Sequence, residues 1–208
     1  MFGHEAAVRC LDCHGQKPLS SGGDRTLRLW KLTDETHLVF RPKAVGHVGR
    51  SDDCCRFVDA SHFCSAGDDG ALSYWSARRK KPLSVVPLAH GAADGRNPRW
   101  ISALGAQRAT DVLFSGSCDG HVRLWRLPHA DDAPDVLPLA ATIPAAGFVN
   151  ALCLPDRSTS SNGCAPVAPF LAVAASHEHR LGRWWGRLKH SPNAVLLVPL
   201  LNTTPDSS

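Results

Sequence analysis

One short motif recurs along the chain and constrains the fold more than any other feature. Its clearest copy, residues 115–125, predicts a strand, a tight turn at Asp119-Gly120 and a second strand ending at Trp125. Apolar and polar residues alternate in this second strand, as on a strand with one buried face. Four copies share an acidic residue six positions before a tryptophan: Asp24 to Trp30, Asp69 to Trp75, Asp119 to Trp125, and Glu178 to Trp184.

The intervals between these tryptophans are close to the length of a repeat that forms one four-stranded sheet. A histidine opens each of the first three repeats. We therefore predict an all-β fold of about four four-stranded blades, with boundaries near 3–43, 44–88, 89–142 and 143–201, and a disordered tail at 202–208. In the last repeat we expect strands at 147–152, 170–174, 180–185 and 195–200, the final one closing the blade. The outer strand of the third repeat is expected at 136–141.

The pattern resembles the WD-repeat family of β-propellers, whose members usually have seven blades. Four blades predict an open arc or a tight ring, and we expect a shortened chain that lacks further blades. The resemblance implies that the histidine, a strand serine, the turn aspartate and the tryptophan of each repeat form a buried hydrogen-bond relay. The implied relay residues are His4, Ser20, Asp24, Trp30, His47, Ser65, Asp69, Trp75, His90, Ser115, Asp119, Trp125, Glu178 and Trp184.

A serine, a histidine and an aspartate could also form a hydrolase triad. Three copies of the set argue against this interpretation, because a catalyst needs one site whereas a scaffold needs one relay in every repeat. We therefore predict no enzymatic activity. The fourth repeat departs from the pattern, since it has Ala174 and Glu178 at the relay positions and no opening histidine.

Cysteines are frequent, with eight in 208 residues, and we expect reduced thiols. Cys10 and Cys13 form a Cys-x-x-Cys pair followed by His14, a pattern of zinc and haem-attachment sites. On a strand, positions three apart point to opposite faces, so these two cysteines would not share a metal. We predict neither a metal site nor a cofactor.

Net charge is +4, from 23 Lys and Arg against 19 Asp and Glu, which permits a polyanionic partner without requiring one. Two basic clusters are candidate RNA contacts, since Lys and Arg beside aromatic residues can hold a nucleic-acid backbone. The first cluster could equally be a solvated loop or a nuclear localisation signal. The candidate RNA-binding residues are Arg78, Arg79, Lys80, Lys81, Arg180, Arg183 and Arg187.

Longer segments carry a closer resemblance, above all residues 177–185 (HEHRLGRWW), together with 66–83, 100–102 and 144–152. They are similar to the C-terminal half of the WD-repeat proteins associated with U3 small nucleolar RNA. The resemblance implies a nucleolar, and therefore nuclear, scaffold that binds U3 RNA and box C/D core proteins. Such a scaffold would act in the small-subunit processome during processing of the precursor of 18S ribosomal RNA.

Two further expectations concern partners. The longest apolar run, residues 194–201, is too short to span a bilayer, so we expect no membrane association. We also expect no small-molecule substrate. The alternative function is a general WD-repeat platform for protein–protein interactions without RNA binding.

Overall fold

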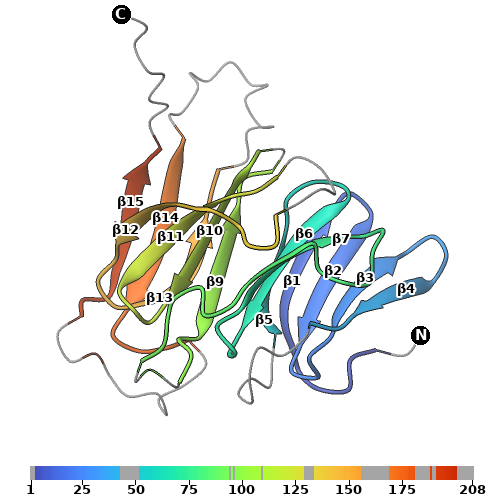
Figure 1. The fold of residues 1–208 in the computed structure, drawn as a ribbon, viewed down its shortest axis with the longest axis horizontal. Helices are drawn as coiled ribbons and strands as arrows, with labels where there is room; N and C mark the ends of the chain where they lie inside the picture. The colour runs from blue at the N-terminus through green and yellow to red at the C-terminus, as the bar shows by residue number, and fades with distance from the viewer. Residues whose placement is uncertain are drawn as a thin grey trace, which may run out of the picture.

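Four antiparallel β-sheets follow one another along the chain and lie side by side in a curved series (Figure 1). The computed structural model describes residues 3–42, 52–93, 95, 97–108, 110–128, 134–155, 169–180, 188 and 191–200. The first three sheets have four strands each and the fourth has three, and within every sheet the strands are ordered as in the sequence. This is the all-β, repeated-blade architecture that the recurring motif predicts.

The first strand of each sheet lies innermost, because β1 contacts β5, β5 contacts β9, and β9 contacts β13. The first sheet contains β1 (Val8–His14), β2 (Lys17–Gly22), β3 (Leu27–Lys31) and β4 (Thr36–Phe40). The second contains β5 (Asp52–Phe57), β6 (His62–Gly67), β7 (Leu72–Ser76) and β8 (Ser84–Val86). The third contains β9 (Ile101–Ala106), β10 (Val112–Ser117), β11 (His121–Arg126) and β12 (Leu139–Pro144). The fourth contains β13 (Phe148–Cys153), β14 (Phe170–Ser176) and β15 (Ala194–Pro199).

The turn between the second and third strands of a sheet needs a left-handed backbone conformation. Gly70 and Gly120 supply it in the second and third sheets, with φ angles of 69° and 74°. Arg25 occupies the corresponding position in the first sheet with a φ of 57°. The preceding aspartate secures each turn by accepting a hydrogen bond from the backbone amide two residues further on.

Three apolar cores lie between the four sheets. Trp75 belongs to the core between the first and second sheets, and Tyr74 to the core between the second and third. Neighbouring residues of β7 thus face opposite sheets, as the pleat of a strand requires. Between the third and fourth sheets the backbone at Gly116 approaches so closely that a Cβ atom there would lie 2.6 Å from the Cβ of Val149.

The two terminal sheets each have one face that no described sheet covers. On this face of the first sheet Leu11 is 66% exposed, and on that of the fourth sheet Val195 and Leu197 are 69% and 66% exposed. Elsewhere in the series the equivalent faces are packed against a neighbouring sheet. The chain therefore forms a curved stack, and apolar side chains are exposed on both of its end faces.

The fourth sheet corrects one sequence-based expectation. We expected residues 180–185 as its third strand and 195–200 as its closing strand. Instead β15 pairs with β14 along its whole length and takes the third position. β14 and β15 are hydrophobic strands that lie before and after a long connection. They pair through backbone hydrogen bonds and contribute apolar side chains to the same core. In the third sheet, the outer strand is Leu139–Pro144, later than the expected 136–141.

Candidate functional site: hydrogen-bond relays and a basic central cavity

The third repeat contains an unbroken chain of hydrogen bonds from its opening histidine to its tryptophan. His90 Nδ1 lies 2.9 Å from Asp119 Oδ2, and His90 Nε2 lies 2.8 Å from Ser115 Oγ. Trp125 Nε1 donates to the same Ser115 Oγ at 2.8 Å. Burial lowers the pKa of His90 and outweighs the opposing effect of Asp119. A neutral imidazole with its proton on Nδ1 satisfies every donor and acceptor in this relay.

The first repeat has the same arrangement. His4 Nδ1 lies 2.9 Å from Asp24 Oδ1, and His4 Nε2 lies 2.7 Å from Ser20 Oγ. Ser20 Oγ accepts a hydrogen bond from Trp30 Nε1 at 2.9 Å. Thr26 adds donors to Asp24 Oδ1 from its backbone amide and its hydroxyl, at 3.1 Å and 2.8 Å.

The second repeat is described only in part. Trp75 Nε1 donates to Ser65 Oγ at 3.1 Å, and Asp69 Oδ1 accepts from the backbone amide of Ala71 at 3.0 Å. His47, which we expect to join these residues, lies outside the described residues.

In the fourth repeat an asparagine organises the turn after β14. Asn150 Nδ2 donates to Ser176 Oγ at 2.7 Å and to the Glu178 carbonyl at 2.9 Å, and its Oδ1 accepts from the Arg180 amide at 2.8 Å. Glu178 thus contributes its backbone to this turn, while Trp184 lies outside the described residues. Sequence reasoning missed Asn150, because a single asparagine on an inner strand carries no repeat signal.

Buried hydrogen bonds make the first relay sensitive to acid. Burial alone would raise the pKa of Asp24, but hydrogen bonds from His4, the Glu5 amide and Thr26 outweigh it and lower the pKa to about 2. The ionised carboxylate is therefore favoured in the folded state. Its stabilising effect is fully present above the ordinary aspartate pKa and is lost as the pH falls towards 2.

We expect Asp24→Asn to lower the free energy of unfolding at pH 7 by about 2 kcal/mol. The same variant should show a shallower loss of stability between pH 4 and pH 2, because the titrating carboxylate is gone. Urea unfolding followed by far-ultraviolet circular dichroism at several pH values measures both effects. Asp34→Asn, at an exposed carboxylate between β3 and β4, is the control. Equal acid dependence in wild type and Asp24→Asn would contradict the assignment.

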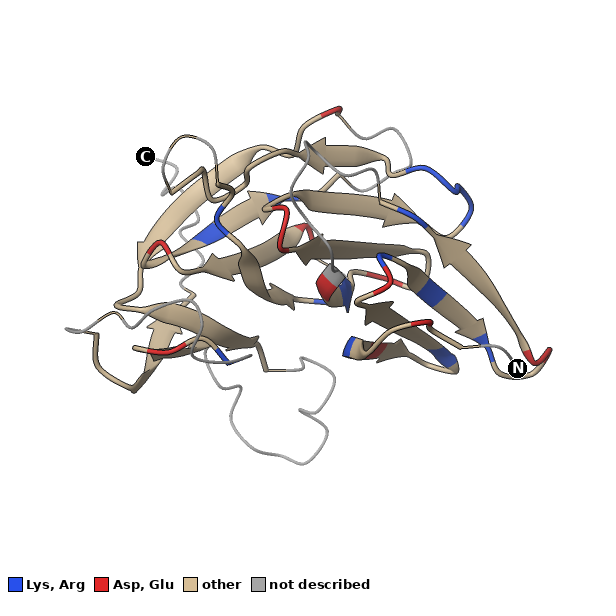
Figure 2. Cartoon of the chain, turned by 90° about the horizontal axis from the view of Figure 1, so that it is seen from below, with Lys and Arg blue, Asp and Glu red and all other residues tan. Residues whose placement is uncertain are grey.

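The structure describes the whole of the first predicted basic cluster and only Arg180 of the second. Arg78–Lys81 form the exposed turn between β7 and β8, the continuous blue stretch at the edge of the molecule in Figure 2. Arg180 instead reaches the inner side of the second sheet, where it donates to the Asp53 carbonyl at 3.0 Å. Arg183 and Arg187 lie outside the described residues.

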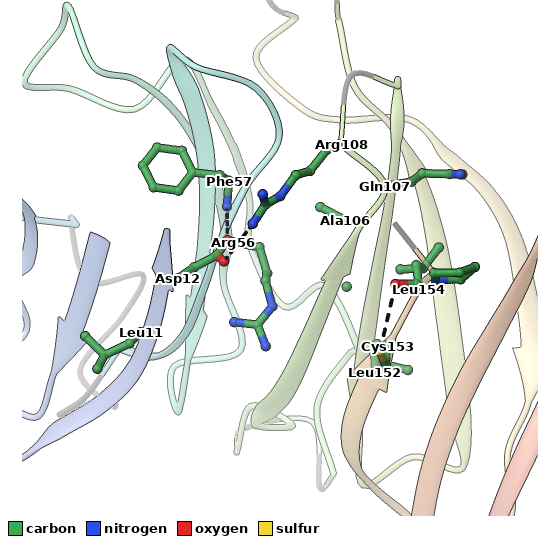
Figure 3. A pocket seen from close by; sticks show the side chains of 12 residues that line it. Leu11, Asp12, Arg56, Phe57, Ala106, Gln107, Arg108, Leu152, Cys153 and Leu154 are labelled. Carbon is green, nitrogen blue, oxygen red and sulfur yellow. Dashed lines mark hydrogen bonds and ion pairs between the residues drawn. The ribbon is translucent and has the colours of Figure 1, made fainter. Parts of the chain in front are cut away.

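A cavity of about 350 Å³ opens at the C-terminal ends of the four inner strands (Figure 3). Arg56, Arg108 and Asp12 are among the described residues that line it. Arg108 lies 3.5 Å from Asp12 Oδ1 and donates to the Cys13 carbonyl at 2.7 Å, which links the third sheet to the first. The Phe57 amide donates to Asp12 Oδ2 at 2.7 Å. Among the described residues that line the cavity, these two arginines and this aspartate carry charge, and Arg108 is paired with the aspartate.

Sequence reasoning did not identify the arginines of the central cavity. Arg56 and Arg108 are isolated in the sequence, and only the stacking of the sheets brings them together. A charge run such as Arg78–Lys81 is visible in a sequence, whereas a site built from one residue per repeat is not.

The described cysteines and histidines form no metal centre. Cys10 Sγ lies 3.6 Å from the Cys55 carbonyl, whereas Cys13 Sγ lies 3.0 Å from the Gly15 carbonyl, so the two thiols have different surroundings. Among the described residues, no group of three His, Cys, Asp or Glu side chains has the arrangement of a metal site. In the same part of the chain, no helix has the length and apolar character needed to cross a membrane.

Comparisons with known proteins agree with this architecture. The sequence profile of the family "WD domain, G-beta repeat" matches residues 1–31 and 95–126. U3 small nucleolar RNA-interacting protein 2 of Homo sapiens is 37% identical over 169 residues, which cover 80% of this chain and 32% of the human protein. Ribosomal RNA-processing protein 9 of Saccharomyces cerevisiae is 25% identical over 252 residues, which cover 94% of this chain and 43% of the yeast protein. The crystal structure of RRP9 WD40 repeats superposes with a TM-score of 0.81 at 35% identity, over 97% of this chain and 57% of that one.

Fold, repeat and comparisons together place the chain in the WD-repeat class of β-propeller proteins. Within this class it is a homologue of the WD-repeat proteins that are named for the U3 small nucleolar ribonucleoprotein. The chain spans less than half the length of the curated relatives described above.

Proposed function

We propose that this chain is a non-catalytic scaffold of the U3 small nucleolar ribonucleoprotein. In this role it binds U3 RNA and box C/D core proteins and acts in ribosome biogenesis, during processing of the precursor of 18S ribosomal RNA. The nucleus, and within it the nucleolus, is the corresponding location. The observation that carries the proposal is the extended likeness to U3-named WD-repeat proteins, over 80% of this chain in the human relative.

Exposed positive charge supports an RNA partner. Arg78, Arg79, Lys80 and Lys81 are all exposed on the turn between β7 and β8, without an intervening acidic residue. Four adjacent cations on one turn can follow consecutive phosphates of a nucleic-acid backbone. We therefore assign the first RNA contact to this turn.

Burial of the relay serines supports a non-catalytic role. Ser115 and His90 are each fully buried, and the hydroxyl of Ser115 is shared between His90 and Trp125. A substrate could reach this hydroxyl only after the sheets separated. The His–Ser–Asp sets therefore serve to connect strands within a repeat.

The test is a salt series of U3 RNA binding. We expect replacement of Arg78, Arg79, Lys80 and Lys81 by Gln to flatten the dependence of log K on log salt by about 3 units, because each phosphate contact on a single strand contributes about 0.7. Affinity at low salt should fall most, since the counterion effect is then largest. Filter binding or fluorescence anisotropy with labelled U3 RNA measures both quantities.

A matched control removes the same number of charges from the first sheet. The replacement of Lys17, Arg25, Lys31 and Arg41 by Gln, all at exposed positions, should leave a steeper salt slope than the test variant. Identical slopes for wild type and test variant would exclude the turn as a contact. If a pull-down with the wild-type protein recovers processome proteins but no U3 RNA, the result would instead favour a general protein-interaction platform.

A further inference from the structure

An arginine on one inner strand contacts a cysteine on the next. Arg56 Nη1 on β5 lies 3.1 Å from Cys10 Sγ on β1. The same Nη1 donates to the Cys55 carbonyl at 2.8 Å, which fixes the guanidinium beside the sulfur. Cys55 also approaches Cys10 from β5, with its Sγ 3.9 Å from the Cys10 carbonyl. A cation therefore lies beside the Cys10 sulfur, and the Cys55 thiol lies beside the Cys10 backbone.

These contacts divide the thiols of the cluster into two kinds. A hydrogen bond from Cys55 and the charge of Arg56 together outweigh burial and lower the pKa of Cys10 to about 5. Burial raises the pKa of Cys54, and the hydrogen bond to Cys10 together with burial raises that of Cys55. The opposite directions of these shifts favour a thiolate at Cys10 over one at Cys54 or Cys55.

A small cavity gives access to this sulfur. It has a volume of about 60 Å³ and is lined by Cys10 and Arg56 together with Cys54, Asn150 and Arg180. A cavity of this size holds more than one water molecule, so an uncharged molecule as small as hydrogen peroxide can enter. Cys10 itself is only partly buried.

Charged groups around the cluster come from three sheets. Arg56 on β5 contacts the sulfur directly, and Arg180 of the fourth sheet lines the same cavity. The carboxylate of Asp53 lies 3.8 Å from Arg9. The negative charge of Asp12 on β1 favours the charged form of Arg56. Arg56 and Arg180 line the cavity beside the sulfur, whereas neither Asp12 nor Asp53 does, and this favours an anionic sulfur there.

We propose that Cys10 is a nucleophilic modification site for small uncharged electrophiles, with peroxides as the natural class. The Cys10 thiolate attacks one oxygen of hydrogen peroxide, an S–O bond forms and the O–O bond breaks. The sulfur loses two electrons to give sulfenic acid, and hydroxide leaves and takes up a proton as water. Arg56 is a positioning residue, because it holds the anionic sulfur without touching the electrophile.

A pH profile of alkylation tests the proposal with the native 208-residue chain. Iodoacetamide is added at pH 6, 7 and 8, and peptide mass spectrometry measures the rate at each cysteine. An ordinary thiol loses about 70-fold in rate between pH 8 and pH 6, because its thiolate fraction falls. We expect Cys10 to change by less than about twofold over this range. Cys13, an exposed thiol on the same strand, is the internal control.

Two variants separate the role of Arg56 from that of general positive charge. Arg56→Gln should give Cys10 a steep profile, with a rate at pH 6 at least about tenfold below that at pH 8. Arg108→Gln removes a neighbouring arginine that contacts Asp12, and should leave the flat profile unchanged. Because the wild-type profile alone decides the matter, a poorly folded variant does not weaken the test.

Peroxide provides the second measurement. Treatment of the wild-type chain at pH 6 followed by a sulfenic-acid trap should label Cys10 before Cys13 and Cys153. A Cys10 rate that falls with pH in parallel with Cys13 would overturn the proposal. A Cys10 that stays unmodified in the folded chain by both reagents would overturn it equally.

Discussion

Trp125→Ala is expected to lower the free energy of unfolding by about 3–5 kcal/mol. The side chain is 4% exposed and fills the core between the second and third sheets. Its removal leaves a cavity there and also deprives Ser115 of the donor at 2.8 Å. Because domains are stable by only about 5–15 kcal/mol, this single change should remove a large part of the total. Urea unfolding followed by circular dichroism measures it without relying on tryptophan fluorescence.

Trp30→Ala is the matched control for this prediction. Trp30 donates the same kind of hydrogen bond, to Ser20 Oγ at 2.9 Å, but it lies on the end face of the first sheet and is only half-buried. We expect a loss of about 1–2 kcal/mol, from the hydrogen bond and the partial burial. Equal losses in the two variants would mean that the relay, and not packing between sheets, determines the contribution of the tryptophan.

Much of the fold follows from local sequence signals. The Asp-Gly turns and the alternation around Trp75 and Trp125 are short-range features, so strands β6, β7, β10 and β11 could be located from sequence alone. The third strand of the fourth sheet could not. Residues 180–185 retain the tryptophan spacing, and 181–185 lie outside the described residues. The segment that pairs with β14 is the more apolar Ala194–Pro199. A local motif does not reveal which segment further along the chain will take such a position.

Part of the candidate site could likewise be predicted from the sequence, and part of it could not. The relay residues His90, Ser115 and Asp119 recur at fixed spacing, and the structure brings them within hydrogen-bond distance of one another. Arg56 and Arg108 show no such spacing, since they meet only when inner strands of different sheets converge on the central cavity. Contacts between repeats depend on the geometry of stacking, which no single repeat encodes.

Asp119→Ala is the second change with a large expected effect, a loss of about 3–5 kcal/mol. The carboxylate is 2% exposed, accepts from His90 at 2.9 Å and lies 3.2 Å from Arg123 Nη2. It also accepts from the His121 amide at 3.1 Å, which secures the turn. Removing the anion leaves a buried imidazole donor, and a largely buried guanidinium, without their charged acceptor. A buried polar group without a partner destabilises the fold by more than the lost attraction alone, because water cannot reach the group to replace the missing partner.

Asp111→Ala measures what an ion pair contributes on the surface of the same sheet. Asp111 lies 2.7 Å from Arg126 Nη1, and the two side chains are 32% and 54% exposed. Since water screens this pair, we expect a loss of at most about 1 kcal/mol. The two losses, from urea unfolding at one pH, therefore compare a buried carboxylate that has several partners with a solvent-exposed ion pair. Similar losses for Asp119→Ala and Asp111→Ala would show that the relay carboxylate is not shielded from solvent, and the structural role assigned to the relay would have to be given up.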